Sequence, residues 1–247
     1  ALRFDGRRWT LLDNDDSSFS AIWSNGPERY FAAGPMGIIA RYDRGRLTRI
    51  SCNTENNLEA IWGTSASNVF AVGWTGTVLH YDGRRCTQQR TLTNRGLYGV
   101  WGNAPDSVFA VGDRGTILHY DGRAWSAQRS GTDQRLRAVA GTSATDVFAV
   151  GPEGVVLHYD GQTWTRQTTP SGVWLRAVWA ARPDDVFAVG DGGAVLHYDG
   201  RTWSAQQSGT TLPLRCVWGL PTGEVFAGGA KGLILHRSRS RPPSEPR

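Results

Sequence analysis

The chain has 247 residues, 39% of them hydrophobic, which is enough for one large domain with its own core. It contains no apolar run of about eighteen residues, so a membrane-spanning helix is not expected. The net charge is +5, carried almost wholly by arginine, and part of it lies in the Pro/Ser/Arg-rich segment 238–247. That segment is predicted to be a tail or linker outside a single domain of residues 1–237. Because the domain itself is close to neutral, nucleic acid is not an expected partner.

In chain order, the first predicted strands are 2–6 and 8–12, which match the third and fourth of four β-like segments that recur along the chain. The four types are seen in residues 58–63, 69–73 and 76–81 and, for the fourth, 202–206, each rich in β-branched and aromatic residues. The second type, Val-Phe-Ala-Val-Gly and its weaker copies, places a phenylalanine every 39 residues, at positions 31, 70, 109, 148, 187 and 226.

Four short antiparallel strands in each repeat of about forty residues are typical of a β-propeller blade. The period leaves no room for a helix of about ten residues, which excludes helical solenoids. The sequence therefore predicts an all-β, six-bladed β-propeller of four-stranded blades. The last copy ends after its third segment, so the N-terminal strand is expected to complete that blade and to remove its exposed edge.

The turn between the third and fourth segments reads His-Tyr-Asp-Gly-Arg-Thr-Trp at residues 197–203, with close copies around His80, His119 and His158. This pattern resembles the Asp-box (BNR) propellers, which include sialidases and the photosystem II stability/assembly factor family. It departs from the usual box because Asp and Gly are adjacent here. The resemblance implies that the box aspartates cap tight hairpins and that the box tryptophans pack beneath them. The residues so assigned are Asp5, Asp82, Asp121, Asp160 and Asp199, with Trp9, Trp125, Trp164 and Trp203.

The residues that most often carry chemistry occupy repeated positions. All five histidines (His80, His119, His158, His197 and His236) share one position, which Arg3 and Arg41 also fill, so we interpret them as packing residues. The three cysteines show no CxxC spacing, which predicts no metal site and at most one disulfide. No catalytic triad or phosphate-binding loop is found, and no catalytic residue or cofactor is assigned.

The two faces of the predicted disc differ in their loops. Turns between the first and second strands, and between the third and fourth, keep the same residues in each copy. On the opposite face, the turns between the second and third strands and the crossings between blades vary from copy to copy. We hypothesise that this varied face binds the ligand; drift in unconstrained loops is the alternative.

One ring on that face is predicted to line the mouth of the central channel. It consists of the second residue of each first strand: Ser20, Glu59, Tyr98, Arg137, Arg176 and Arg215. Three arginines on adjacent blades would form a positive arc suited to carboxylate, sulfate or phosphate groups. The mixture is similar to the arginine triad and Tyr/Glu pair that the resemblance implies for sialidases, although the motif positions do not match. Structural packing between blades is the alternative role.

Two further candidates are Trp74 and Trp174, which lie in varied turns where other copies carry small or polar residues. An exposed indole beside polar groups suits a sugar ring, whereas packing inward against the neighbouring blade is the alternative.

These observations favour a non-catalytic binding module that recognises a protein or a glycan on the varied face. A glycoside hydrolase or lyase acting on anionic carbohydrate is one alternative, and it would need two nearby carboxylates, Glu59 with Glu55 or Asp16. A structural scaffold is the other. The resemblance and the preference for arginine over lysine suggest a bacterial, secreted or cell-surface protein.

Overall fold

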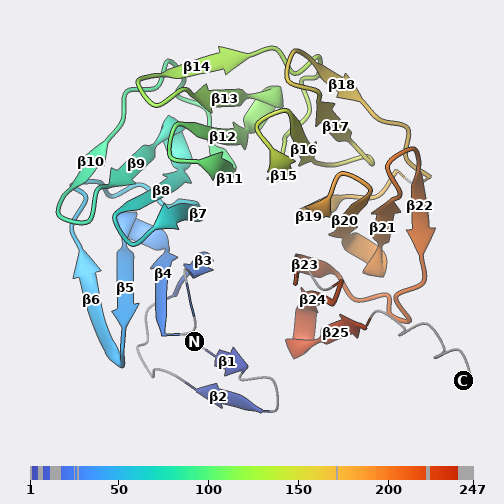
Figure 1. Ribbon diagram of the computed structural model, residues 1–247, viewed down its shortest axis with the longest axis horizontal. Coiled ribbons are helices and arrows are strands. Elements are labelled where there is room, and N and C mark those ends of the chain that lie inside the picture. The colour runs from blue at the N-terminus through green and yellow to red at the C-terminus, as the bar shows by residue number, and fades with distance from the viewer. Residues whose placement is uncertain are drawn as a thin grey trace, which may run out of the picture.

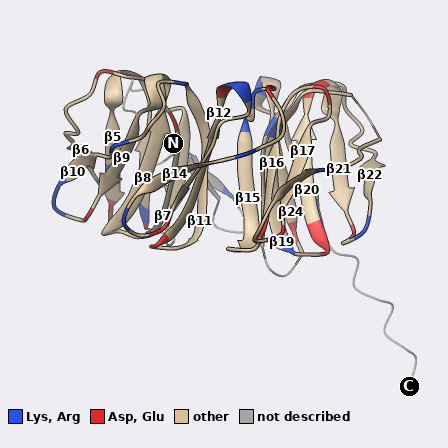
Figure 2. Cartoon of the chain, turned by 90° about the horizontal axis from the view of Figure 1, so that it is seen from above, with Lys and Arg blue, Asp and Glu red and all other residues tan. Residues whose placement is uncertain are grey.

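The computed structural model describes residues 2–4, 8–11, 18–24, 26, 28–170, 172–220 and 223–238. Six antiparallel sheets stand radially around a central channel, and the chain visits them in order around the ring (Figure 1). Seen from the side the ring is a flat disc, with charged residues in the loops of both faces (Figure 2). The predicted all-β, six-bladed propeller is confirmed. The predicted tail lies outside the described residues, apart from Ser238.

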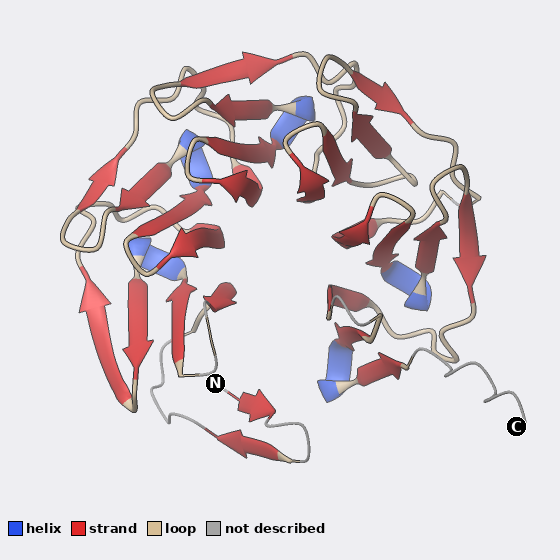
Figure 3. Cartoon of the chain, viewed as in Figure 1, coloured by secondary structure: helices blue, strands red, loops and turns tan. Residues whose placement is uncertain are grey.

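The helical elements among the described residues are five single-turn 3-10 helices, and none of them could cross a membrane (Figure 3). In chain order the elements are β1 (Leu2–Phe4), β2 (Trp9–Leu11), β3 (Ala21–Ser24), β4 (Arg29–Ala33), η1 (Pro35–Gly37), β5 (Ile39–Asp43), β6 (Arg46–Ile50), β7 (Leu58–Ser65), β8 (Asn68–Gly73), η2 (Trp74–Gly76), β9 (Val78–Tyr81), β10 (Cys86–Gln88), β11 (Leu97–Ala104), β12 (Ser107–Gly112), η3 (Asp113–Gly115), β13 (Ile117–Tyr120), β14 (Trp125–Gln128), β15 (Ala138–Ser143), β16 (Asp146–Val150), β17 (Val156–Tyr159), β18 (Trp164–Arg166), β19 (Leu175–Arg182), β20 (Asp185–Gly190), η4 (Asp191–Gly193), β21 (Val195–Tyr198), β22 (Trp203–Gln206), β23 (Leu214–Gly219), β24 (Val225–Gly229), η5 (Ala230–Gly232) and β25 (Ile234–Arg237).

After its first residue, the second strand of each middle blade is apolar, because both of its faces are covered by neighbouring blades. In β12, Val108, Phe109, Ala110 and Val111 are all fully buried. The phenylalanine of this strand contacts the third strand of its own blade, where Phe109 lies opposite His119. The repeated phenylalanines therefore form the centre of each blade.

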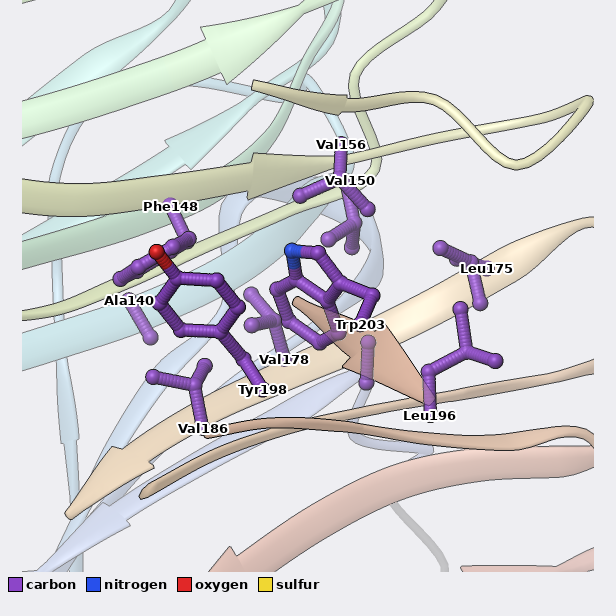
Figure 4. Packing of buried hydrophobic residues seen from close by; sticks show 11 residues of the cluster. Ala140, Phe148, Val150, Val156, Leu175, Val178, Val186, Leu196, Tyr198 and Trp203 are labelled. Atoms are coloured by element: carbon purple, nitrogen blue, oxygen red, sulfur yellow. The ribbon is translucent and has the colours of Figure 1, made fainter. Parts of the chain in front are cut away.

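The same phenylalanines also join each blade to the next. The ring of Phe148 lies 5.5 Å from that of Tyr198 and 6.0 Å from that of Trp203, which it meets edge-on. Figure 4 shows Trp203 enclosed by apolar side chains of both blades. Equivalent edge contacts join Phe70 to Trp125 and Phe109 to Trp164. The box tryptophans thus act as wedges between blades, which confirms their structural assignment; the side chain of Trp9 lies outside the description.

A second inter-blade contact lies nearer the channel. The six-membered edge of Trp62 passes 2.8 Å from the point where a side chain on Gly102 of the next blade would begin. The pairs Trp101 with Gly141 and Trp179 with Gly219 repeat this contact. In the fourth blade Ala140 stands at the repeat position of these tryptophans. The fifth blade correspondingly has Ala180 at the glycine position, and Ala140 and Ala180 belong to one apolar cluster. Each first strand is therefore matched in volume to its neighbour.

One disulfide joins the first two blades, between Cys52 and Cys86, and Cys216 is a free, exposed cysteine. Cys86 begins β10 and occupies the repeat position that Trp125 fills in the following blade. The disulfide lies in the apolar cluster around Phe31 and Tyr81. A covalent wedge thus takes the place of the tryptophan at this one boundary.

The ends of the chain pair differently from the prediction. Among the described strands, β2 pairs with β1, and β23, β24 and β25 form a three-stranded sheet without a fourth strand. The β1–β2 hairpin lies beside the gap between the first and last blades (Figure 1). The reason is local: β1 is itself a third-type strand, so β2 has a partner a few residues away in sequence and does not pair with β25. The last blade consequently keeps an edge that no described strand pairs with.

Candidate functional site

The face opposite the varied one, where the turns keep the same residues in each copy, is called the uniform face here. The box aspartates cap its turns. Asp160 accepts hydrogen bonds at Oδ1 from the backbone N–H groups of Gln162 and Thr163, both at 2.8 Å. Asp82, Asp121 and Asp199 make the same two bonds. These backbone hydrogen bonds hold the pKa values of all four carboxyl groups below their usual range. The aspartates thus cap hairpins, as predicted; Asp5 lies outside the described residues.

The histidines pack on this side of the blades. Each one stacks on the phenylalanine of its own blade, as His80 does on Phe70 with 4.4 Å between ring centroids. Burial lowers the pKa of His80 and of His119 below the usual value. His158 instead bonds to a carboxylate, Asp146, at 2.7 Å. The packing interpretation of the histidines is confirmed.

On the varied face the backbone repeats and the side chains do not. Each turn between the second and third strands has a central residue in the left-handed region, for example Thr75 at φ 54°, Arg114 at φ 51° and Glu153 at φ 53°. Only the side chains presented by this common turn differ. The fold therefore specifies the loop shape and leaves the chemistry of each turn free to vary.

The predicted ring does line one cavity. Side chains from the starts of all six first strands surround a space of ≈ 360 Å³ at the channel, and the six ring residues are Ser20, Glu59, Tyr98, Arg137, Arg176 and Arg215. First strands contact one another from β7 to β23, which brings successive members of the ring together.

Glu59 is held by two partners. Trp74 donates its indole N–H to Oε1 of Glu59 at 2.9 Å, and Nη1 of Arg137 lies 3.5 Å from Oε2. Both carboxylate oxygens are thereby engaged. Glu55, in contrast, lines a separate cavity beside Met36, and Asp16 lies outside the described residues. Glu59 and Glu55, the two described carboxylates predicted to act together, therefore line different cavities.

Tyr98 lies at the centre of a second cluster. Its hydroxyl donates to Oδ2 of Asp113 at 3.0 Å, and burial together with this bond raises the pKa of Tyr98. Arg135 pairs with the other oxygen of Asp113 at 2.7 Å. The guanidinium groups of Arg135 and Arg137 lie 4.8 and 5.1 Å from the centre of the Tyr98 ring. The tyrosine thus contacts two arginines of the single crossing that leads into β15.

Arg176 forms a two-pronged ion pair with Asp191, at 2.5 Å from Nε and 3.0 Å from Nη2. The hydrogen bond raises the pKa of Arg176, and its guanidinium carbon lies 5.9 Å from the centre of the Trp174 ring. Trp174 and Trp74 keep 47% and 49% of their surface exposed. About half of each indole is therefore accessible at this face.

These contacts follow one rule, which the sequence prediction missed. The ring residue of a blade meets the first residue of the next turn of the same blade, fifteen positions later: Glu59 meets Trp74, Tyr98 meets Asp113 and Arg176 meets Asp191. In the other three blades this turn position offers no side-chain hydrogen bond, because it holds Pro35, Pro152 or Ala230.

Two of those three blades carry the remaining ring arginines. Arg137 has Pro152 fifteen positions later, and its guanidinium group pairs instead with Glu59 of another blade. Arg215, opposite Ala230, is exposed and makes no hydrogen bond or ion pair within the part of the chain that the structure describes. The repeat could have indicated that Arg215 lacks a carboxylate partner, because Asp113, Asp191 and Ala230 stand at one repeat position. Using that indication required knowing that this turn position faces the ring.

The radial four-stranded sheets and the channel that they enclose define a β-propeller. No protein-family model matches the chain, and no curated protein matches it significantly.

Solved structures do resemble it in fold. YCF48 bound to a D1 peptide superimposes with a TM-score of 0.71 at 17% identity, covering 94% of this chain and 83% of that one. Virginiamycin B lyase from Staphylococcus aureus gives 0.76 at 9% identity, over 92% and 86% of the two chains. The WD40 repeats of RRP9 give 0.77 at 12% identity, over 92% and 78%. At these identities the likeness concerns the fold alone.

Proposed function

We propose that this propeller is a non-catalytic module that binds an extended protein segment at the channel mouth through an acidic group of that segment. The observation that carries the proposal is Arg215, a ring cation exposed at the cavity and lacking the carboxylate that Arg176 has in Asp191. Arginine forks recognise carboxylates through paired hydrogen bonds. A ligand carboxylate would supply the partner that Ala230 does not.

The neighbouring groups suit an extended chain better than a compact anion. Trp174 and Trp74 offer half-exposed apolar surfaces on the same face, and Tyr98 lines the cavity between arginines. Aromatic residues and arginine are the side chains most enriched at the energetic centres of protein interfaces. The peptide seen on YCF48 supports the idea that a propeller of this shape can hold such a segment.

The test begins with a decapeptide library, from which the tightest binder is retained and its Asp and Glu residues are replaced by Asn and Gln. We expect this neutralised peptide to bind at least about tenfold more weakly, and Arg215→Ala to cause a similar loss. Ala230→Asp should block binding as well, because it recreates the pair seen between Arg176 and Asp191 while leaving Arg215 in place. Arg201→Ala, in a turn of the uniform face, is the matched control and should bind normally. Equal affinity for the neutralised peptide would contradict the proposal.

A glycan is the second candidate ligand, favoured by the two half-exposed indoles on one face. A glycan array with wild type, Trp74→Ala and Trp174→Ala separates the two. Saturable sugar binding lost in either variant would support the glycan, and binding unaffected by both would reject the aromatic site.

An extracytoplasmic, bacterial setting remains part of the proposal. The disulfide between Cys52 and Cys86 supports it, because disulfides persist mainly in oxidising compartments.

A further inference from the structure

The last blade has an open edge with a cavity beneath it. Among the described residues its outermost strand, β25, pairs with β24 alone, and a space of ≈ 440 Å³ lies between this blade and the one before. Ile234 on β25 is 47% exposed, whereas Val156, its counterpart two blades earlier, is buried in the cluster around Trp203 of the following blade. The face of β25 that carries Ile234 thus lacks the cover that its counterpart has.

The lining of this cavity repeats the surroundings of a tryptophan. The apolar residues that line it include Phe187, Val189, Val195, Val217, Val225 and Leu235. Each lies 39 residues after a member of the cluster that encloses Trp203, namely Phe148, Val150, Val156, Val178, Val186 and Leu196 (Figure 4). The cavity is therefore the position that Trp203 occupies one blade earlier, without its tryptophan.

The polar and charged groups at the cavity suit an indole as well. In an earlier blade, Trp164 donates its indole N–H to Oε1 of Gln128 at 2.7 Å. Gln206 is the counterpart of Gln128 two repeats later, and it lines the cavity. Arg237 replaces the tyrosine that stacks on the tryptophan in other blades, and its guanidinium carbon already lies 5.0 Å from the centre of the Phe187 ring. An entering indole would be stacked by this cation.

No described strand pairs with the free edge of β25. The strand β2, which is of the fourth type, is hydrogen-bonded to β1, and the segment 238–247 contains no aromatic residue. We propose that the β25 edge binds an extended segment of another polypeptide by β-strand addition, with a tryptophan of that segment filling the cavity. In the register of β21 and β22, the tryptophan would lie opposite Arg237 and the third residue after it opposite Ile234.

The probe is a dye-labelled peptide with the sequence of residues 199–208, which is the segment that fills the equivalent place one blade earlier. It is added to the full 247-residue chain, and binding is followed by fluorescence anisotropy. We expect saturable binding, reduced at least about tenfold when the tryptophan of the peptide is replaced by alanine, because burying an indole supplies much of the binding free energy.

Two protein variants locate the site. Leu235→Arg places a charge in the cavity and should abolish binding. Ile234→Arg is the matched control, since alternate residues of a strand point to opposite faces and Ile234 does not line the cavity. Arg215→Ala should leave this peptide's affinity unchanged, which separates the site from the channel mouth.

Three results would overturn the assignment: no binding of the peptide, equal binding of its alanine form, or equal loss in the Leu235→Arg and Ile234→Arg variants. Binding that appears only in a Trp9→Ala variant would also overturn it, because the chain's own N-terminal strand would then be the occupant.

Discussion

Two groups of tryptophans in this propeller have opposite environments. Trp125, Trp164 and Trp203 recur at one repeat position and are buried between blades, whereas Trp74 and Trp174 each occur once and remain about half exposed at the channel rim. A side chain that recurs from blade to blade serves the packing that those blades share. One that appears in a single copy is free to serve a ligand. The comparison therefore assigns stability to the first group, and our proposal assigns recognition to the second.

The largest expected effect is on the buried group. Trp164 is 8% exposed, so Trp164→Ala leaves a cavity between two blades and should lower the free energy of unfolding by about 3–5 kcal/mol. Trp174→Ala is the control at the rim and should change it by less than about 0.5 kcal/mol. Denaturant unfolding at neutral pH measures both. Equal losses in the two variants would remove the distinction between the groups.

A second, smaller effect concerns the boundary where the wedge is a disulfide. Replacing both Cys52 and Cys86 by serine should cost about 2–4 kcal/mol, because their sequence separation is 34 residues and the closed loop restrains the unfolded chain. The double variant Cys52→Ser/Cys86→Trp should regain part of that loss under reducing conditions. Serine is the residue found at the position equivalent to Cys52 in the third blade, Ser130, next to the boundary that Trp164 fills. No recovery would show that the wedge does not transfer between blades.

The smallest expected effect concerns the buried histidines and the dependence of stability on pH. His80 bonds to Asn68, which is neutral, and burial lowers its pKa from the usual 6.5. A histidine with a depressed pKa stabilises the fold fully above that usual value, and the stabilisation is lost as pH falls below it. Wild-type stability should therefore decrease between pH 7.5 and 5.5.

The exchange Asn68→Asp gives His80 the carboxylate that His158 has in Asp146. Burial raises the pKa of Asp146, but the hydrogen bonds from His158 and Thr142 together with the charge of His158 outweigh it and lower that pKa. The variant should gain stability relative to wild type as pH falls, by less than about 1 kcal/mol. Asp146→Asn is the reverse exchange and should lose stability over the same range. Thermal unfolding across this pH series measures both; parallel curves for all three proteins would contradict the assignment.

The fold and the position of the ring could be predicted because both depend only on the repeat. A phenylalanine every 39 residues determines the blades, and the blades place Glu59, Tyr98 and the ring arginines at one channel. The contacts within the ring could not be predicted, because they depend on a turn residue fifteen positions away whose direction only the folded chain shows. The disulfide pairing could not be predicted either, because Cys52 and Cys86 stand at different repeat positions.

The pairing of the chain ends was the least predictable feature. The sequence contains a fourth-type strand at its start and a three-strand copy at its end, which favours joining them. It also contains a third-type strand, Leu2–Phe4, directly before that fourth-type strand, and the nearer partner is the one that pairs. Pattern alone ranks these two pairings equally, whereas the short connection between β1 and β2 decides between them.

The matched pairs of first-strand residues make the order of the blades part of the protein's specification. Trp101 needs the glycine at position 141, because a methyl group there would meet the indole at less than 3 Å. If the fifth blade were moved to follow the third, Ala180 would bring such a methyl group against Trp101. If the fourth blade were duplicated, Ala140 would face a glycine and leave a hollow. Although the copies look interchangeable in sequence, a module transplanted or repeated in this array would have to bring its neighbour with it.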